Sequence, residues 1–387
     1  MRKWFSLLLV VVILAAAIPL MGCGSEKEAY KVGAIFAQTG TNSSLGTPEA
    51  QTVEMMVQRI NDAGGIDGHK LEVIVYDTKS LSDECVILTN RLIDQDGVLA
   101  IIGPSSTGES LAIKGIVDAA EVPLVSCAAG AQIVTEAPTK WVFKTPQSDV
   151  LAVQEMYKYM KSKGWTQIAI LTDSGGYGKG GKAALESEAA TYGMNIIAKE
   201  TFDPAGTDMT AQLTNIKNTG AQAFVCWTTS QGAAVVAKNR ADLNMTMPLV
   251  CSHGVANTTF ITNSGAAANG VVFPAGKLLV ADQLDDTDPQ KDVLLTYKED
   301  FEEAYPGKTA DTFGGHAYDA LNMVVEALDE VGADKAKIRD YIESEITDWA
   351  GTGGIFNITP TDHMGLTEGC FIMVEVVNGE WTWLKTS

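Results

Sequence analysis

The sequence predicts an α/β protein built from two Rossmann-like lobes. Short apolar runs alternate with amphipathic segments along most of the chain, a pattern typical of parallel sheets with helices on both faces. The alternation comes as two successive series of similar size. The 387 residues are enough for two lobes that each bury a core.

The first series starts close to residue 30 and predicts a parallel sheet. Val53, Met56, Val57 and Ile60 recur at helical spacing, and Gly64-Gly65 marks the end of that helix. The expected strands are 31–36, 71–76, 98–102 and 122–126, and further helices are expected near 82–95 and 107–120.

The second series repeats this pattern, and the C-terminal part departs from it. Expected helices are 148–163, 180–192, 207–219 and 230–243, and expected strands are 167–172, 195–200, 222–227 and 248–252. Further helices are expected near 288–304, 311–331 and 333–346. Asn378-Gly379 between the apolar runs 371–377 and 381–384 predicts a β-hairpin.

The N-terminus has the features of a secretory signal. Arg2 and Lys3 precede an uncharged apolar run over 4–20. Leu20-Met21-Gly22-Cys23 resembles the lipobox of bacterial lipoproteins, which implies cleavage after residue 22 and lipidation of Cys23. The alternative is an uncleaved membrane anchor, for which the run is short. We expect 1–22 to be a signal peptide and 23–29 a tether, with the protein lipid-anchored outside the cytoplasm.

The net charge argues against one class of partner, and the cysteine pattern argues against a disulfide-stabilised fold. Removing 1–22, which holds Arg2 and Lys3 and no acidic residue, would change the net charge from −20 to −22. Such a charge argues against nucleic acid as a partner. The five cysteines other than Cys23 form no C-x-x-C, so a full disulfide framework is not expected. Pairing of Cys226 with Cys251 stays open.

The segment DSGGYGKGG (173–181) raises the possibility of a nucleotide site. Gly176, Gly178 and Gly181 fit G-x-G-x-x-G between a strand and a helix, and Glu200 follows at the expected distance. This would indicate a nucleotide-dependent oxidoreductase. The motif lies in the second series, however, and little NAD is available to an exported protein. We therefore expect no cofactor.

The segment IIGPSSTGES (101–110) contains a second candidate site. Ser106 and Glu109 form a capping box, which by itself explains the hydroxyl. The same geometry, at the carboxyl end of a strand and the start of a helix, also suits a carboxylate ligand. Both interpretations stay open from this stretch alone.

Catalytic motifs are absent from the sequence. The four histidines form no H-E-x-x-H, no G-x-S-x-G occurs, and no Cys/His cluster has zinc spacing. A soft metal bound by Cys127, Cys226, Cys251 and His253 is conceivable, but structural burial of these cysteines is the favoured interpretation. We expect neither an enzyme nor a metal site.

Several motifs together resemble one protein family. INDAGGIDGHKLEVIVYD (60–77) is similar to the I-N-x-x-G-G-I-x-G-x-x-L signature of type I periplasmic solute-binding proteins of ABC importers, in the branched-chain amino acid (Leu/Ile/Val) branch. IIGPSS, VPLVS, DSGGYGKG and HAYDA follow in that family's order, so the resemblance runs from about residue 30 to the C-terminus.

The resemblance implies two lobes joined by a three-strand hinge, with ligand trapped between them by hinge closure. It places the crossings near 145–148, 274–277 and 354–358. Lobe 1 would then comprise 30–145 and 277–355, and lobe 2 would comprise 146–276 and 356–387. The implied partners are a small solute and the permease and ATPase subunits of an importer, and we expect a monomer. A sensory receptor of the same fold is the alternative.

The resemblance also implies a set of ligand-binding positions. Thr107, with Ser106 beside it, matches the hydroxyl that holds the ligand carboxylate, and Tyr177 matches a tyrosine that contacts ligand from the second lobe. The remaining matched positions are Leu45, Ala128 and Ser230.

Two positions depart from the family pattern. Gly130 replaces a hydroxyl residue, and His253 aligns with the acid that binds the ligand ammonium. A histidine cannot replace a carboxylate in that role, although it can donate to an anion or an amide. We therefore expect a small carboxylate, amide or aromatic acid somewhat ahead of a standard branched-chain amino acid. A slip of one or two residues would instead leave His253 an ordinary loop residue.

Overall fold

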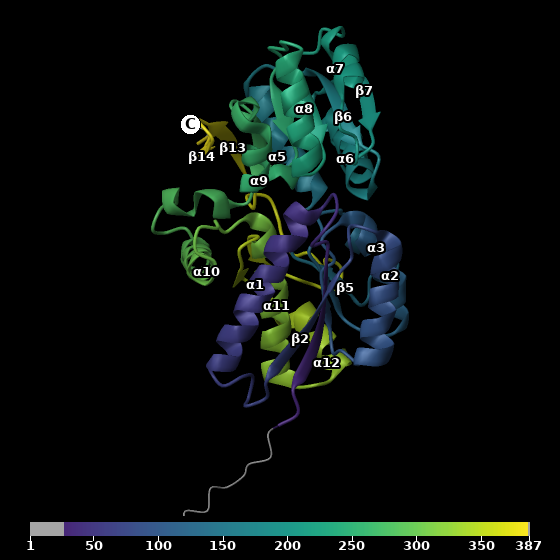
Figure 1. The fold of residues 1–387 in the computed structure, drawn as a ribbon, viewed down its shortest axis with the longest axis vertical. Coiled ribbons are helices and arrows are strands. Elements are labelled where there is room, and N and C mark those ends of the chain that lie inside the picture. Colours follow the sequence, from purple (N-terminus) through teal and green to yellow (C-terminus); the bar gives the residue numbers. More distant parts are fainter. Residues whose placement is uncertain (1–26, 386–387) are drawn as a thin grey trace, which may run out of the picture.

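The computed structural model describes residues 27–385 as two α/β lobes stacked along the long axis of the molecule (Figure 1). The N-terminal part of the chain lies in one lobe, and residues from about 149 to 275 form most of the other. Within 27–385, no helix combines the length and apolar character needed to cross a membrane.

The sheet of the first lobe is parallel throughout, in the order β2-β1-β3-β4-β5. Its strands are β1 (Tyr30–Phe36), β2 (Leu71–Asp77), β3 (Ile101–Ile102), β4 (Leu124–Ser126) and β5 (Val142–Lys144). The short edge strand β5 was not predicted from the sequence.

Helices cover both faces of this sheet. They are α1 (Ser43–Asp62), α2 (Ser82–Arg91), α3 (Thr107–Ala119), α4 (Gln132–Thr135), α10 (Lys291–Ala304), α11 (Thr312–Val331) and α12 (Lys335–Glu345). A π-helical turn, η1 (Leu92–Asp96), extends α2. The helix marked by Val53 begins ten residues before it, so Leu45 lies in a first turn. The hydrophobic core between α1, α11 and the sheet holds this lobe together.

The sheet of the second lobe has the order β14-β13-β10-β9-β8-β6-β7. Its strands are β6 (Gln167–Asp173), β7 (Asn195–Phe202), β8 (Ala223–Trp227), β9 (Leu249–Cys251), β10 (Val272–Ala275), β13 (Ile372–Val377) and β14 (Glu380–Trp383). The last two strands are antiparallel and form the predicted hairpin. Asn378 and Gly379 both have positive φ, as the turn between such strands requires.

The helices of the second lobe are α5 (Asp149–Ser162), α6 (Gly176–Tyr192), α7 (Thr210–Lys217), α8 (Ser230–Asp242) and α9 (Thr258–Ser264), with 3₁₀ turns η2 (His253–Val255), η3 (Gly265–Ala268) and η4 (Lys277–Gln283). The expected start of a helix at residue 180 was wrong, because α6 begins at Gly176. Four glycines in its first two turns weaken the helical signal in the sequence, but the helix forms because tertiary contacts override this low intrinsic propensity.

The third crossing between the lobes also differs from the expected one. A small antiparallel pair, β11 (Trp349–Ala350) and β12 (Ile355–Phe356), precedes it. Ile358, Met364 and Leu366 lie in the core of the first lobe, whereas Cys370 and Phe371 pack in the second. The expected crossing at 354–358, and with it the start of lobe 2 at 356, was therefore wrong. Residues 357–366 turn back on themselves through the bond from Asn357 N to Gly365 O (2.8 Å).

Candidate functional site

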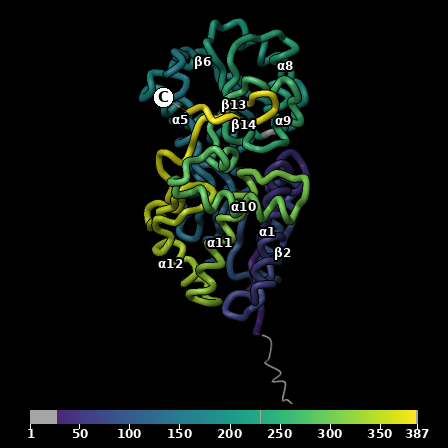
Figure 2. Tube along the Cα trace, turned by 90° about the vertical axis from the view of Figure 1, so that its left-hand side faces the viewer, coloured from purple at the N-terminus to yellow at the C-terminus, as the bar shows by residue number. Residues whose placement is uncertain are grey.

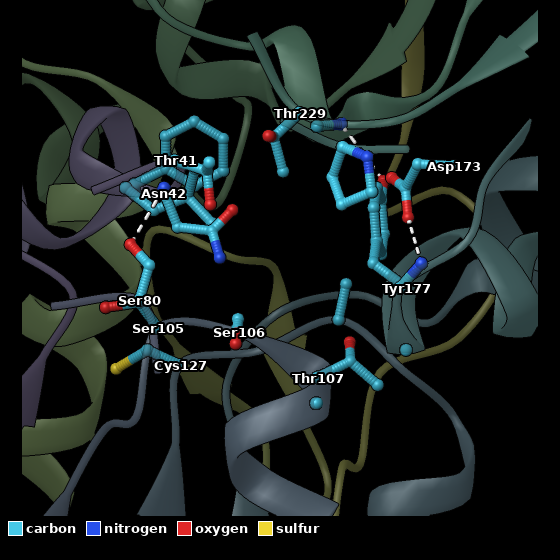
Figure 3. A pocket seen from close by; sticks show the side chains of 18 of the residues that line it. Thr41, Asn42, Ser80, Ser105, Ser106, Thr107, Cys127, Asp173, Tyr177 and Thr229 are labelled. Carbon is cyan, nitrogen blue, oxygen red and sulfur yellow. Dashed lines mark hydrogen bonds between the residues drawn. The ribbon is translucent and has the colours of Figure 1, made fainter. Parts of the chain in front are cut away.

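A cavity of about 200 Å³ lies between the two lobes. Its wall includes residues from the segments that follow β1, β2, β3 and β4 in the first lobe and β6, β8 and β9 in the second. The carboxyl ends of parallel strands in both sheets therefore meet at one place. Figure 3 shows Ser106 and Thr107 below this space, Thr41, Asn42 and Ser80 on one side, and Asp173 and Tyr177 on the other.

The start of α3 forms the first-lobe wall. Ser106 is the N-cap of this helix: its Oγ accepts from Glu109 N (3.4 Å) and donates to Glu109 Oε2 (2.6 Å), which confirms the capping box. Thr107 Oγ1 accepts from Gly130 N (3.1 Å) and keeps its own hydrogen for a ligand. The first-turn amides of α3 add further donors at the positive end of the helix dipole.

Ser105 and Glu49 form a buried pair that the sequence analysis missed. Ser105 lines the cavity, accepts from Ala37 N (3.0 Å) and donates to Glu49 Oε2. Glu49 is fully buried, and this burial raises its pKa well above the usual range. Because both bonds are already made, Ser105 offers a ligand a lone pair and not a hydrogen.

The end of β6 and the start of α6 form the second-lobe wall. Asp173 lines the cavity, is almost fully buried, and accepts at Oδ1 from Gly175 N (2.8 Å). Burial raises the pKa of Asp173, opposed by hydrogen bonds from Thr228, Gly175 and Gly178. The first turn of α6 carries Tyr177 into the wall, so this tyrosine is helical and not part of a loop.

His253 belongs to an aromatic cluster beside the cavity. Its ring contacts Tyr177, Trp227 and Phe371, with centroid separations of 5.2–5.7 Å. Burial lowers its pKa to about 3, and the positive charge of Lys144 acts in the same direction. Burial likewise lowers the pKa of His316, which also lines the cavity, to about 3. Both imidazoles are neutral near pH 7, and none of the described lining residues is a lysine or arginine.

The structure brings five of the predicted positions into this wall: Leu45, Ser106, Thr107, Tyr177 and His253. Ala128 and Gly130 are not among the residues that line the cavity, whereas Ala129 between them is. A Cβ placed on Gly130 would lie 2.4 Å from Thr107 Cγ2, so a hydroxyl side chain has no room there.

The side chains of two further predicted residues, Ser230 and Cys23, are not described by the structure. Ser230 begins α8, but its side chain is not described, and Thr229 lines the cavity beside it. Cys23 and the signal segment lie outside the described residues. Several cavity residues that were not predicted, including Thr41, Asn42 and Thr229, lie in the segments between the end of a predicted strand and the next helix, so the position of the strand ends was a usable signal.

The five cysteines between residues 27 and 385 are free and buried. Cys226 and Cys251 sit opposite each other on β8 and β9, and Cys127 lines the cavity. In this part of the chain, no group of three or more His, Cys, Asp or Glu side chains is arranged to hold a metal ion.

Residues 29–380 match the protein family described as Periplasmic binding protein. The chain belongs to this family. The "Leu/Ile/Val-binding protein homolog 3" of Brucella melitensis is 24% identical over 307 residues, which are 78% of this chain and 79% of that one. The sequence-based resemblance to periplasmic solute-binding proteins is thus confirmed, and this relative is named as a homolog of the Leu/Ile/Val-binding protein.

Solved structures show the same two-lobed fold. An extracellular ligand-binding receptor of Rhodopseudomonas palustris HaA2 has a TM-score of 0.86 at 25% identity, covering 92% of this chain and 99% of that one. A branched-chain amino acid transporter substrate-binding protein of Streptococcus pneumoniae, in complex with isoleucine, has a TM-score of 0.80 at 24% identity, covering 91% and 97%. The predicted fold class is confirmed. Membership in the periplasmic binding family indicates a binding protein outside the cytoplasm.

Proposed function

We propose that this periplasmic binding protein captures a small carboxylate-bearing solute between its lobes and delivers it to the permease of an ABC importer. The candidate solutes are an amino acid or a related organic acid, aromatic acid or amide. The observation that carries the proposal is the cavity at the meeting point of α3 and α6. Two helix N-termini that face one small cavity favour a carboxylate.

The chemistry of the wall supports a ligand that has both an acceptor end and a donor end. The Thr107 hydroxyl and the α3 amides offer hydrogens to a carboxylate. Ser105 and Asp173 offer lone pairs to an N–H or O–H group. In Streptococcus pneumoniae, the related protein binds isoleucine, which carries both kinds of group. Leu45 and Phe313 supply apolar surface for a side chain.

The remaining parts of the proposal concern location and partners. We propose that lipid on Cys23 anchors a monomer to the outer side of the cytoplasmic membrane or to the periplasmic side of the envelope. The partners would be the permease and ATPase subunits of the importer. The negative net charge of −20 disfavours nucleic acid as a further partner.

A thermal-shift screen of the purified protein tests the proposal. The screen covers amino acids, aromatic acids, amides, short fatty acids and NAD(P). A solute at a hundredfold excess over its Kd stabilises the folded state by about 2.7 kcal/mol, which raises Tm measurably. We expect at least one carboxylate-bearing solute to do so, and mass spectrometry should recover it unchanged. A shift with NAD(P) alone would contradict the proposal.

A matched pair of variants locates the binding. Thr107→Val removes the hydroxyl that faces the cavity, so we expect the ligand-induced shift to fall strongly. Thr135→Val removes an exposed hydroxyl at the end of α4, whose bond to Ala131 O is local, and should keep the shift. Equal shifts in both variants would place the ligand elsewhere.

A further inference from the structure

The segment after β9 has two separate contacts with its surroundings. His253 lines the cavity, and four residues later Asn257 reaches the first lobe. Asn257 Nδ2 donates to Ser44 O (3.0 Å) across the lobe interface, and Asn257 is fully buried. Its Oδ1 accepts from Phe260 N (3.2 Å) and so caps α9. Figure 1 and Figure 2 both show α9 next to the end of α1 that faces the second lobe.

The Ser44 carbonyl, which accepts the bond from Asn257, has no helical N–H partner, because the residue four positions on is Pro48. Ser44 is the second residue of α1, and its helical partner four positions on is Pro48. Proline has no N–H, so the usual i to i+4 bond to Ser44 O cannot form. A buried carbonyl without a donor costs free energy, whereas an exposed carbonyl bonds water. Closing the lobes thus leaves this carbonyl in need of a protein donor, and Asn257 supplies one.

A second bond from the adjacent residue runs in the opposite direction. Thr312 Oγ1, at the start of α11 in the first lobe, donates to Ala256 O (3.0 Å). Both bonds are buried and both join residues far apart in the sequence. Residues 256–257 are therefore fixed to the first lobe by a donor and an acceptor.

We infer that Asn257 is a latch for lobe closure, matched to the carbonyl that Pro48 leaves unbonded in α1. This inference rests on the proposed function, because closure is the event that captures the solute. The latch and His253 lie on one short turn, η2 and the residue pair after it. A solute that binds between the lobes favours the closed state, and in that state Asn257 reaches Ser44. The latch contacts no ligand, so it strengthens capture without selecting the solute.

The variant Asn257→Ser tests the latch. Serine is also a preferred N-cap, so α9 keeps its cap, whereas the shorter side chain cannot reach Ser44 O. We expect the solute-free protein to be more open, with a larger radius of gyration in small-angle scattering. We also expect Kd to rise about three- to tenfold, by the same factor for every solute that binds. Asn215→Ser is the control, because that exposed amide bonds Glu200 within the second lobe.

Pro48→Ala supplies an independent second test. It restores an N–H to position 48, which bonds Ser44 O in both the open and the closed state. We expect Asn257→Ser to open the Pro48→Ala variant less than it opens the wild type. Equal opening in both backgrounds, or no opening by Asn257→Ser, would overturn the latch. Scattering needs no solute, so these outcomes stay distinct from a failed thermal-shift screen, which would count against the proposed function instead.

Discussion

At the level of single residues, Asp173 is the carboxylic acid side chain that lines the cavity. The sequence resemblance predicts that His253 takes the place of the family's ammonium-binding acid, and the structure leaves that imidazole neutral. Asp173, in the same lobe, nevertheless places a carboxyl in the cavity wall. Its Oδ1 also bonds Gly175 N, so the side chain combines a structural bond with an acceptor position beside the cavity.

Asp173→Asn separates these two roles. The amide oxygen still accepts from Gly175 N, whereas the charge is lost. If the solute carries an ammonium group, we expect Kd to rise about tenfold or more, because a charge-assisted hydrogen bond becomes a neutral one. A deaminated analogue should bind both proteins equally. Calorimetry measures both affinities.

Asp208→Asn is the matched control for this substitution. Asp208 Oδ1 accepts from Thr210 N (2.8 Å) in an exposed turn of the second lobe, so it makes a similar local bond away from the cavity. We expect unchanged affinity. Weaker binding of the deaminated analogue by Asp173→Asn would show that the structural bond to Gly175 N, and not the charge, determines the affinity.

At the level of elements, the N-termini of α3 and α6 face each other directly. A Cβ placed on Gly176 would lie 2.9 Å from both N and Cα of Gly108. These atoms belong to the backbone of the other lobe and cannot move aside without moving α3. The glycine-rich segment at 173–181 therefore permits close approach of the two lobes, in addition to the strand-to-helix turn.

Gly176→Ala should prevent full closure. The added methyl meets the first lobe only when the lobes are closed, so each lobe keeps its fold, and alanine favours the helix by up to about 1 kcal/mol. We expect solute affinity to fall at least about tenfold while the Tm of the solute-free protein stays equal or rises.

Gly115→Ala is the comparison for that variant. Gly115 lies inside α3, and a Cβ there would meet nothing within 4 Å. The helix gains the same propensity, and the lobe interface is unaffected. Unchanged solute affinity of Gly176→Ala would mean that, in the liganded protein, Gly176 and Gly108 do not approach as closely as they do in this structure.

At the level of the whole molecule, buried charged groups gather where the chain crosses between lobes. Lys144 ends β5, is fully buried, and donates to Pro146 O and to Met364 Sδ (3.6 Å). Burial lowers the pKa of Lys144 and raises the pKa of Asp149 at the start of α5, and the attraction between the two charges opposes both shifts. Through these two bonds, Lys144 connects the first crossing between the lobes with the segment 357–366, which comes before the third crossing.

The buried histidines make folding stability depend on pH. The pKa of His316 is about 3 in the folded protein, against about 6.5 in an unfolded chain. The unfolded state therefore binds the extra proton below pH 6.5, and this group destabilises the fold as pH falls from 6.5 towards 3. At pH 5 the effect is about 2 kcal/mol.

His316→Gln removes this dependence at one position. Between pH 7 and pH 5, we expect the variant to lose about 2 kcal/mol less unfolding free energy than the wild type. Urea titrations of both proteins at each pH measure the difference, and the pH 7 value serves as each protein's own reference. Parallel pH profiles would contradict the assigned burial of a neutral imidazole.

The sequence by itself determined the α/β class, most strands and helices, the capping box at Ser106 and the turn at Asn378-Gly379. These features depend on residues close together in the chain, so periodicity and local hydrogen bonding reveal them. The motif resemblance also located Thr107, Tyr177 and His253, which the structure places in one cavity wall.

Only the tertiary structure decided which residues from the two lobes meet. It placed Asp173 in the wall and left Gly130 out of it, moved the third crossing beyond Leu366, and joined Ser44 to Asn257. None of these contacts has a period or a local signal, because each depends on how two separately folded lobes are packed together. Pro48 shows the same limit, because only the structure places it inside α1, four residues after Ser44, and only the structure shows which donor reaches the Ser44 carbonyl.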